Sequence, residues 1–484
     1  MVLHGRSDRR PRRVQLLPAA LRVRSLVRDA VAGAGRAGRR RLLAVAALVS
    51  PAAVLAQEPP QAEPPRRALP APLASPPFPS AEWQGYPLVG VPPSTTTWPT
   101  TALLHELVPA LAPRLRAYGW ATTSANLSSA RDSNLPSSYW LVPNSVQLEQ
   151  GVVRFEREVD SVQQDHVDWG FRATLLYGTN YRWMTAGGWF SEQLLERNEL
   201  YGFDATELYL DLYVPGLADG SILRVGRWVA CPDIETQFAP DNAMATHSLL
   251  FTHDTYTQTG VMLTTMLDRQ WSVQAGLHAG TDSAPWFEGA VLTGMLGVRW
   301  VAADNDDSLY VVLNAINDAR FQRFEQDGQP SGADNFNYLV GTWQHRVDAD
   351  LHTKTEGYVM WQRDAVVGGR PSLGPVRSFG GGGGLGADIP GTTWTGGVLN
   401  YTSLRLSPQT FVTLRNEWWR DTDGARSGFA GSYTSHGVGL TWNATPSLQV
   451  RPEAVYYRNW DNRAFDLGED QGLWVLGFDV TVRF

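Results

Sequence analysis

Four segments repeat one order of residue types, namely a basic residue, any residue and an acidic residue: Arg154 and Glu156, Lys354 and Glu356, Arg415 and Glu417, and Arg451 and Glu453. Residues two apart on a β-strand share a face, so each pair places opposite charges about 6 to 7 Å apart on one surface. Charges on adjacent strands can then pair crosswise. Two interpretations remain open: a ladder of ion pairs that stiffens a wall, or a constriction whose opposed charges orient polar solutes. The same alternating polar positions hold four further charged residues: Arg172, Glu207, Asp211 and Arg224.

Other reactive side chains do not form a catalytic pattern. Ser435 and His436 are adjacent, so on a strand they point to opposite faces, which argues against a nucleophile and its base. His247 and His253, with Asp254 beside the second, are residue types that bind metals, but solvated or hydrogen-bonded loop histidines are far commoner. We therefore predict no enzyme, no metal site and no cofactor.

Alternation of apolar with polar or small residues, the period of a β-strand, dominates the chain from residue 114 onward. We expect about sixteen strands, within a range of roughly 12 to 18. Their expected positions are 114–125, 146–159, 169–177, 207–214, 221–229, 258–267, 271–280, 290–301, 308–317, 336–346, 351–362, 393–406, 410–420, 435–443, 448–458 and 473–484. This region contains no apolar run long enough for a spanning helix, which excludes a membrane protein built from helices.

The first 113 residues differ in composition from the rest. Residues 1–41 contain 12 of the 41 basic residues and only two acidic ones, and the apolar stretch 42–49 follows directly. This order, with small residues up to Ala56, is typical of a secretory signal peptide, whereas a spanning helix needs about 20 apolar residues. We therefore expect a signal peptide over 1–56, a Pro-rich disordered periplasmic linker over 57–113 and a folded domain over 114–484. Because the basic part is removed with the signal, a nucleic-acid partner is disfavoured.

Aromatic residues near strand ends distinguish two β architectures. A soluble sandwich or propeller and a transmembrane barrel both use half-apolar strands, but no repeat of 40 to 50 residues marks a propeller. Girdles of aromatic residues mark the two interfaces of a bilayer. Such residues collect at the predicted strand ends: Trp169, Tyr177, Trp300, Trp361, Trp418, Trp419, Tyr456, Tyr457 and Trp474. The sequence thus predicts an all-β fold, a transmembrane antiparallel β-barrel that follows a disordered segment.

The end of the chain carries the most specific single signal. Alternate residues from Trp474 to Phe484 form one uninterrupted apolar face, and the last residue is aromatic. This segment resembles the terminal strand of bacterial outer-membrane barrels, which their insertion machinery recognises. Phe484 is therefore predicted to be an assembly signal, and the lipid bilayer and the insertion machinery are predicted partners. The alternative is a terminal core strand of a soluble domain.

The middle of the chain resembles a known family. The segments that carry the resemblance are 207–215, 225–228, 239–242, 248–251, 257–261 and 271–277. They are similar to the OmpL-like family of outer-membrane β-barrel porins, clearly over residues 200–300 and more weakly as far as Phe484. The resemblance implies a barrel in the bacterial outer membrane with a porin role, and it implies no catalytic residues.

We therefore expect a porin through which small hydrophilic solutes diffuse passively, in a water-filled lumen of mixed charge. The alternative is a closed or filled barrel that acts as a structural or adhesive surface protein. Thr353, Thr355 and Gly357 break the apolar face of their strand, which indicates a contact between subunits, and we expect a homotrimer.

Overall fold

The computed structural model of the protein describes residues 99–484, apart from 112–113, 138, 191–199, 231–232, 316, 318–319, 327–328, 334 and 369–385. The predicted signal peptide and most of the predicted linker lie outside the described residues. Both domain boundaries within 1–113 therefore stay predictions.

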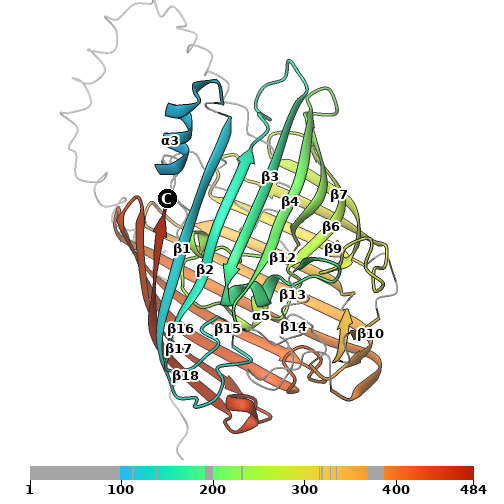
Figure 1. The fold of residues 1–484 in the computed structure, drawn as a ribbon, viewed down its shortest axis with the longest axis vertical. Helices are drawn as coiled ribbons and strands as arrows, with labels where there is room; N and C mark the ends of the chain where they lie inside the picture. Colours follow the sequence, from blue (N-terminus) through green and yellow to red (C-terminus); the bar gives the residue numbers. More distant parts are fainter. Residues whose placement is uncertain are drawn as a thin grey trace, which may run out of the picture. The chain divides into compact units, whose positions relative to one another are not determined.

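Sixteen strands of the described residues form one closed antiparallel barrel, in which β1 pairs with β18 (Figure 1). Each of these strands overlaps one of the sixteen predicted positions, so the predicted fold class is confirmed. The strands are β1 (Leu115–Ser128), β2 (Val146–Arg157), β3 (Asp168–Gly178), β4 (Gly202–Val214), β5 (Ser221–Val229), β6 (Thr257–Met266), β7 (Trp271–Thr281), β8 (Thr293–Val301), β9 (Asp307–Asn314), β12 (Asn337–Arg346), β13 (Leu351–Val366), β14 (Asp388–Ser407), β15 (Thr410–Asp421), β16 (Gly431–Thr445), β17 (Leu448–Asn459) and β18 (Gly472–Arg483).

Short elements occupy the remainder of the described chain. They are α3 (Pro99–Leu107), η2 (Pro109–Leu111), η3 (Thr179–Met184), η4 (Ala239–Asp241), α5 (Leu249–Thr252), η6 (Asp466–Gly468) and the hairpin β10 (Gln322–Gln326) and β11 (Gln329–Ala333). The alternation pattern did not predict this hairpin, which pairs only with itself. None of the helices in the described part of the chain has the length and apolar character required to span a bilayer.

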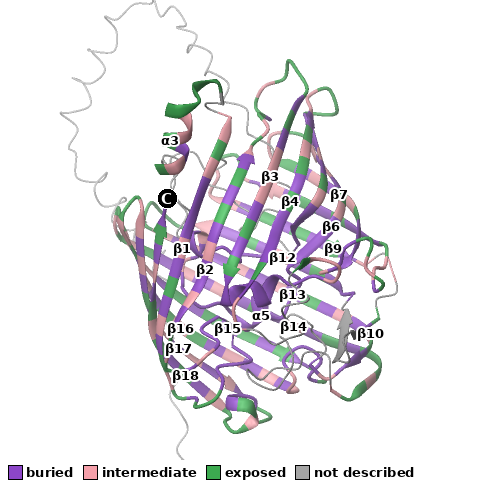
Figure 2. Ribbon diagram, in the orientation of Figure 1, coloured by how far each residue is buried: buried purple, intermediate pink, exposed green. Residues whose placement is uncertain are grey.

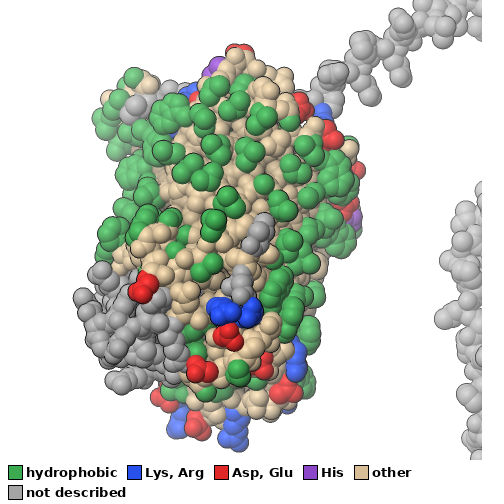
Figure 3. Space-filling view, turned by 90° about the vertical axis from the view of Figure 1, so that its right-hand side faces the viewer, with side chains coloured by type: hydrophobic (Ala, Val, Ile, Leu, Met, Phe, Trp, Pro, Cys, Tyr) green, Lys and Arg blue, Asp and Glu red, His purple; other side chains and the backbone are tan. Residues whose placement is uncertain are grey.

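Burial alternates along each strand, as the period of two requires (Figure 2). On β15, Leu414 and Trp418 are exposed on the outer side, whereas Arg415, Glu417 and Trp419 are buried on the inner side. In the face seen in Figure 3, hydrophobic side chains cover much of the middle of the wall, and charged side chains lie mainly toward its ends. An apolar outer band with a polar inner face is the pattern of a barrel that contacts lipid.

Two of the residues that the sequence assigned to the aromatic girdle do not lie on the outer face. Trp419 and Tyr457 are 0% and 1% exposed and lie inside the barrel, so assigning them to the girdle was wrong. The physical reason is the alternation itself, because Trp418 and Tyr456 precede them directly and already occupy the outer face. The rings of the outer pair Tyr456 and Trp474 are in contact, tilted by 31° with 4.5 Å between their centroids.

The two ends of the barrel differ in the length of their connections. Short turns join most of the strands at the end where β1 begins: 215–220, 267–270, 302–306, 347–350, 408–409 and 446–447, while the connection 158–167 at the same end is longer. Longer connections lie at the other end: 129–145, 179–201, 230–256, 282–292, 315–336, 367–387, 422–430 and 460–471. In outer-membrane barrels the short turns face the periplasm and the long loops face outward.

The last residue closes the barrel. The backbone N–H of Phe484 donates to Gly119 O at 2.9 Å, and Gly119 N–H donates to Phe484 O at 3.0 Å. Beyond this pair β1 has a free edge, which α3 covers, because Thr101 Oγ1 donates to Ala117 O at 2.8 Å and accepts from Ala117 N–H at 3.2 Å. The unpaired edge groups of β1 are thus satisfied where β18 ends.

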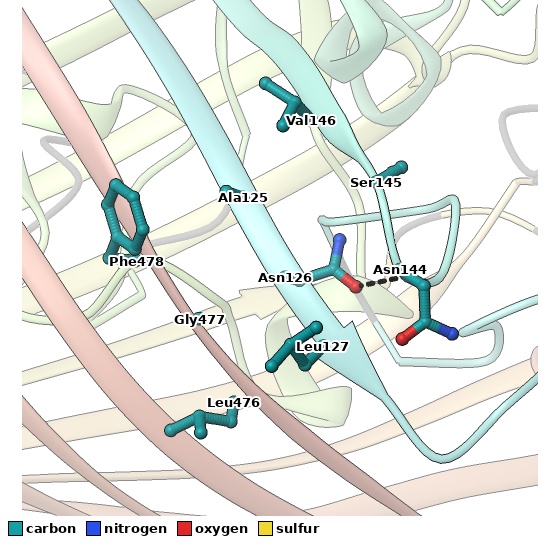
Figure 4. A pocket seen from close by; sticks show the side chains of 9 residues that line it. All are labelled: Ala125, Asn126, Leu127, Asn144, Ser145, Val146, Leu476, Gly477 and Phe478. Atoms are coloured by element: carbon teal, nitrogen blue, oxygen red, sulfur yellow. Dashed lines mark hydrogen bonds between the residues drawn. The ribbon is translucent and has the colours of Figure 1, made fainter.

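A hollow of about 590 Å³ lies beside the same seam, between β1, β2 and β18 (Figure 4). Leu127, Val146, Leu476 and Phe478 line it, and all four side chains are exposed on the outer face. The hollow therefore opens toward lipid and does not belong to the lumen.

Candidate functional site

All twelve charged residues selected from the sequence lie on the inner side of the wall. Ten of them are buried, while Arg172 and Asp211 are partly exposed. That they line an open pore stays a prediction. Their contacts divide the inner wall into two regions with different roles.

The first region, on β2 to β5, is a ladder of ion pairs. Arg154 lies 2.9 Å from the Glu207 carboxylate, and Arg172 lies 2.7 Å from Glu156 and 3.3 Å from Glu207. Asp211 accepts two hydrogen bonds of 2.8 Å from Arg224, a bidentate contact. Here the crosswise pairing expected from the sequence occurs, since each charge finds its opposite on another strand.

The second region, on β13 to β17, holds a loop inside the barrel. We call residues 233–256, which follow β5 and lead into β6, the inner loop. Its helix α5 is completely buried (Figure 2), and Ile234 and Met244 are buried as well. Leu249 and Leu250 of α5 pack with Ile234 and Met244 in one cluster that includes the wall residues Tyr358 and Trp419.

Three wall carboxylates of the second region bind backbone N–H groups of the inner loop. Glu417 accepts from Leu249 at 3.1 Å and from Leu250 at 2.5 Å. Glu453 accepts from Ala245 at 2.7 Å and from Thr246 at 3.0 Å, and Glu356 accepts from Ile234 at 2.8 Å. A buried backbone N–H that loses its acceptor costs about 1 to 3 kcal/mol, so these contacts anchor the loop strongly.

Wall arginines bind the carbonyl groups of the same loop. Arg415 donates to Thr246 O at 2.9 Å, and Arg451 donates to Ala239 O at 2.6 Å and to Asn242 O at 2.9 Å. Arg451 also forms an ion pair with Asp479, which lies directly opposite on the adjacent strand β18. The ladder interpretation therefore holds for β2 to β5 but is incomplete for β15 and β17, because a loop supplies most of the partners there.

Lys354 differs from the other inner cations. Its side chain is buried on β13 and has no hydrogen bond or ion pair within the described part of the chain. Glu356, two residues further along β13, accepts a hydrogen bond from Ile234 of the inner loop. Lys354 is therefore the member of the twelve whose positive charge is least neutralised by direct contact.

An aromatic stack joins the inner loop to two neighbouring loops. The His247 ring lies 3.9 Å from Tyr139 and 4.6 Å from Phe251, and Tyr139 lies 5.7 Å from Trp183. Burial lowers the pKa of His247 well below its usual value, so this ring is neutral at neutral pH. The three loops thus form one packed body inside the long-loop end of the barrel.

The residues considered for metal or catalytic chemistry have structural contacts. His253 stacks on Trp419 at 4.8 Å and lies 3.0 Å from Pro136 O, and no group of three metal-binding side chains occurs among the described residues. Ser435 faces inward and donates to Glu417 at 2.6 Å, whereas His436 faces outward, as the alternation predicts.

Glu235 is a buried acid of the inner loop with an altered pKa. Burial raises the pKa of this carboxyl to about 7, although Arg415 and the hydrogen bonds from Ser248 and Tyr401 lower it. Tyr401 donates to it at 2.7 Å from the wall. A carboxyl of this kind changes charge near neutral pH, inside the packed body.

The sequence pattern did not predict the inner loop, because a loop that folds inward has no strand period. One signal was present. Two segments of the resemblance, 239–242 and 248–251, lie in this loop, and they carry η4 and the start of α5. Apolar residues in a connection between strands, such as Leu249 and Leu250, indicate that the connection is buried.

A closed antiparallel barrel with an apolar outer band, aromatic rings near its edges and a charged inner face defines a bacterial outer-membrane protein. The family model described as Putative beta-barrel porin-2, OmpL-like matches residues 115–484. The chain therefore belongs to this porin family, and the resemblance inferred from the sequence is confirmed.

Solved structures with similar folds have low sequence identity to this chain. Pseudomonas putida OprB is 11% identical with a TM-score of 0.49, covering 80% of this chain and 98% of its own. The Acinetobacter baumannii channel DcaP is 10% identical with a TM-score of 0.45, covering 76% and 97%. Vibrio cholerae OmpT in its trimer form is 10% identical with a TM-score of 0.45, covering 76% and 99%. No curated protein matches the sequence significantly.

Proposed function

We propose that the protein is a porin through which small hydrophilic solutes cross the outer membrane by passive diffusion, in a lumen of mixed charge that the inner loop narrows. The observation that carries this proposal is the inner loop itself, which charges of both signs hold inside a sixteen-stranded barrel. Barrels of 16 to 18 strands typically enclose an aqueous channel, and a fixed inner loop restricts its aperture.

The charge of the lumen supports weak discrimination between solutes. Six of the twelve selected residues are basic and six are acidic. On β2 to β5 the charges neutralise each other in pairs. Such a wall offers hydrogen bonds and a transverse field without a strong net charge. No catalytic step is required by any part of this proposal.

The test is a conductance measurement on purified full-length protein in planar bilayers. The proposal expects stepwise insertion events of constant conductance, and swelling of protein-containing liposomes in small sugars or amino acids. The control is protein that was heat-denatured before addition. Absence of steps with correctly folded barrel, checked by its migration on unboiled gels, would contradict the proposal.

One observation favours the alternative, a non-conducting structural or adhesive barrel. The cluster that includes Trp140, Leu249, Tyr358 and Trp419 is apolar and lies inside the wall. A lumen filled by such packing conducts no ions. The same bilayer measurement separates the two functions, because the filled barrel gives no conductance whether or not residues 57–113 are deleted.

Two partner predictions belong with the proposed function. Recognition by the insertion machinery is proposed for the strand that ends at Phe484. Assembly as a homotrimer is also proposed. One structurally similar protein, OmpT, has been described in a trimer form.

A further inference from the structure

A row of polar side chains crosses the outer face of four adjacent strands. Thr355 on β13 pairs with Asn400 on β14, Asn400 pairs with Asn416 on β15, and Asn416 pairs with His436 on β16. We call these four residues the outer polar row. Burial alternates on each strand so that all four side chains point away from the lumen.

The row lies within the apolar band. On β15, Asn416 stands between Leu414 and Trp418, which are 47% and 49% exposed. On β16, Val438 follows His436 on the same face and is exposed as well. Hydrocarbon chains would therefore surround the row if lipid covered this face.

Half of the row satisfies its own hydrogen bonds. Asn400 Nδ2 donates to Thr353 Oγ1 and to Thr355 Oγ1, both at 2.9 Å. Thr402 Oγ1 donates to Asn400 Oδ1 at 3.1 Å. This half can face lipid at a small cost, because its polar atoms already have partners.

The other half keeps polar atoms without a partner. The His436 Nδ1 and Asn416 Oδ1 atoms are 2.9 Å apart, and since the amide oxygen only accepts, the imidazole donates from Nδ1. The Asn416 amide N–H₂ is then an open donor and His436 Nε2 an open acceptor, with no other hydrogen bond from either side chain within the described residues. Both side chains are exposed. Polar groups without partners in hydrocarbon cost several kcal/mol, and Asn and His characteristically bond to a neighbouring protein there.

We propose that a second copy of this chain covers the outer polar row, with the Asn416 amide of one copy donating to His436 Nε2 of the other. Copies inserted in one membrane share their orientation, so their rows lie at the same depth. The open donor and open acceptor stand side by side on β15 and β16, so two rows that face each other across an axis normal to the membrane are complementary. This pairing supplies the hydrogen bonds that lipid does not offer.

The proposal concerns the face by which copies meet, and it is independent of whether the barrel conducts. The same donor and acceptor meet in a two-fold pair or in successive subunits of a three-fold ring. A dimer or a trimer mass is therefore consistent with it, whereas a monomer is not.

Site-specific cross-linking of purified full-length protein in liposomes tests the proposal. In a Cys231→Ser background, Leu414→Cys places one thiol beside the row on the outer face of β15 and leaves the proposed donor and acceptor intact, and Val261→Cys places a matched control thiol on the outer face of β6, almost opposite in the closed strand order. With a short, membrane-permeant bismaleimide we expect cross-linked copies for Leu414→Cys and none above background for Val261→Cys. Equal cross-linking at both positions, none at 414, or cross-linking at 261 alone would overturn the proposal.

A second variant tests the hydrogen bonds themselves. Asn416→Leu combined with His436→Leu makes the row suitable for lipid and leaves the inner wall unchanged. We expect loss of the oligomer in detergent, measured by light scattering on a sizing column, with the folded barrel still migrating faster than the boiled protein. Persistence of the oligomer in this variant would overturn the proposal.

Discussion

The carboxylate of Glu417 and the backbone N–H of Leu250 are joined by a hydrogen bond of 2.5 Å, which ties β15 to the first turn of a helix buried inside the barrel. Glu417 also accepts from Ser435 on β16, so the same carboxylate links two strands and the inner loop. The charged residue that the alternation placed on the inner face thus acts chiefly as an anchor for a loop far away in the sequence.

Loosening this anchor is expected to widen the pore. In the double variant Glu417→Ala and Glu453→Ala, backbone N–H groups of the inner loop lose their acceptors, each at a cost of about 1 to 3 kcal/mol. We expect a larger and noisier single-channel conductance than in the wild type. The control is Glu288→Ala, which removes an exposed carboxylate outside the barrel wall. Unchanged conductance in the double variant would show that the inner loop does not restrict the aperture.

Removing the last residue is expected to block assembly. Deletion of Phe484 removes both backbone hydrogen bonds to Gly119, and Phe484→Asp removes the ring that packs over this glycine. An added Cβ at Gly119 would lie 2.7 Å from that ring, so the contact is close. We expect both variants to be depleted from outer-membrane fractions, as measured by immunoblot, and Phe484→Tyr to assemble normally. Wild-type amounts of the deleted form would refute the role of this strand as an assembly signal.

Ion selectivity is expected to be weak, leaning toward cations at low salt and nearly lost at high salt. Exposed acidic residues in turns such as 302–306 are screened within about 8 Å at physiological ionic strength, and the named inner charges are balanced. Reversal potentials under a salt gradient at two ionic strengths measure this. Strong selectivity that survives high salt would reveal a charged constriction that these twelve residues do not form.

Reversing one inner charge is expected to increase cation preference. Arg415 is unsuitable for this test, because it is fully buried and anchors the inner loop through Thr246 O. Arg172 is partly exposed on the inner wall, so Arg172→Glu should shift the reversal potential toward cations. The matched control is Arg420→Glu on the outer side of β15, for which we expect no shift. Equal shifts in the two variants would mean that the inner wall does not control selectivity.

The loops at both sides of the seam are expected to lose stability at low pH. Asp466 accepts backbone hydrogen bonds from Arg131, Asp132 and Ser133 at 2.9, 2.7 and 3.1 Å. Burial raises the pKa of Asp466, but the hydrogen bonds from these N–H groups lower it by a larger amount. The pKa of Asp466 in the folded protein is therefore below its usual value. The stabilisation is therefore complete above the unfolded value of about 4 and is lost as pH falls through the lower folded value.

Asp466→Ala should reduce the free energy of unfolding in urea by about 1 to 3 kcal/mol at neutral pH, and by progressively less as pH falls below 4. The control is Glu469→Ala, an exposed carboxylate of the same loop. A difference between wild type and Asp466→Ala that does not change with pH would contradict this origin of the stability.

The sequence alone determined the barrel, because the period of two is a local property. A residue on a strand faces lipid or lumen according to its parity, so the alternation around Trp271, or from Trp474 to Phe484, is sufficient to place each side chain. All sixteen strands and the inner position of all twelve charged residues were predictable for this reason. The same rule, applied to Trp418 and Trp419 together, also corrects the girdle, since neighbours never share a face.

Only the tertiary structure decided which partners these side chains have. Glu417 and Glu207 occupy equivalent positions in the alternation, yet one binds the backbone of an inner loop and the other binds Arg154 of β2 and Arg172 of β3. The position of a residue in the alternation determines whether its side chain faces lipid or lumen. It carries no information on which distant segment of the chain contacts that side chain. Likewise, Asn416 and His436 become neighbours only through the register of β15 with β16, which depends on the closure of the whole sheet.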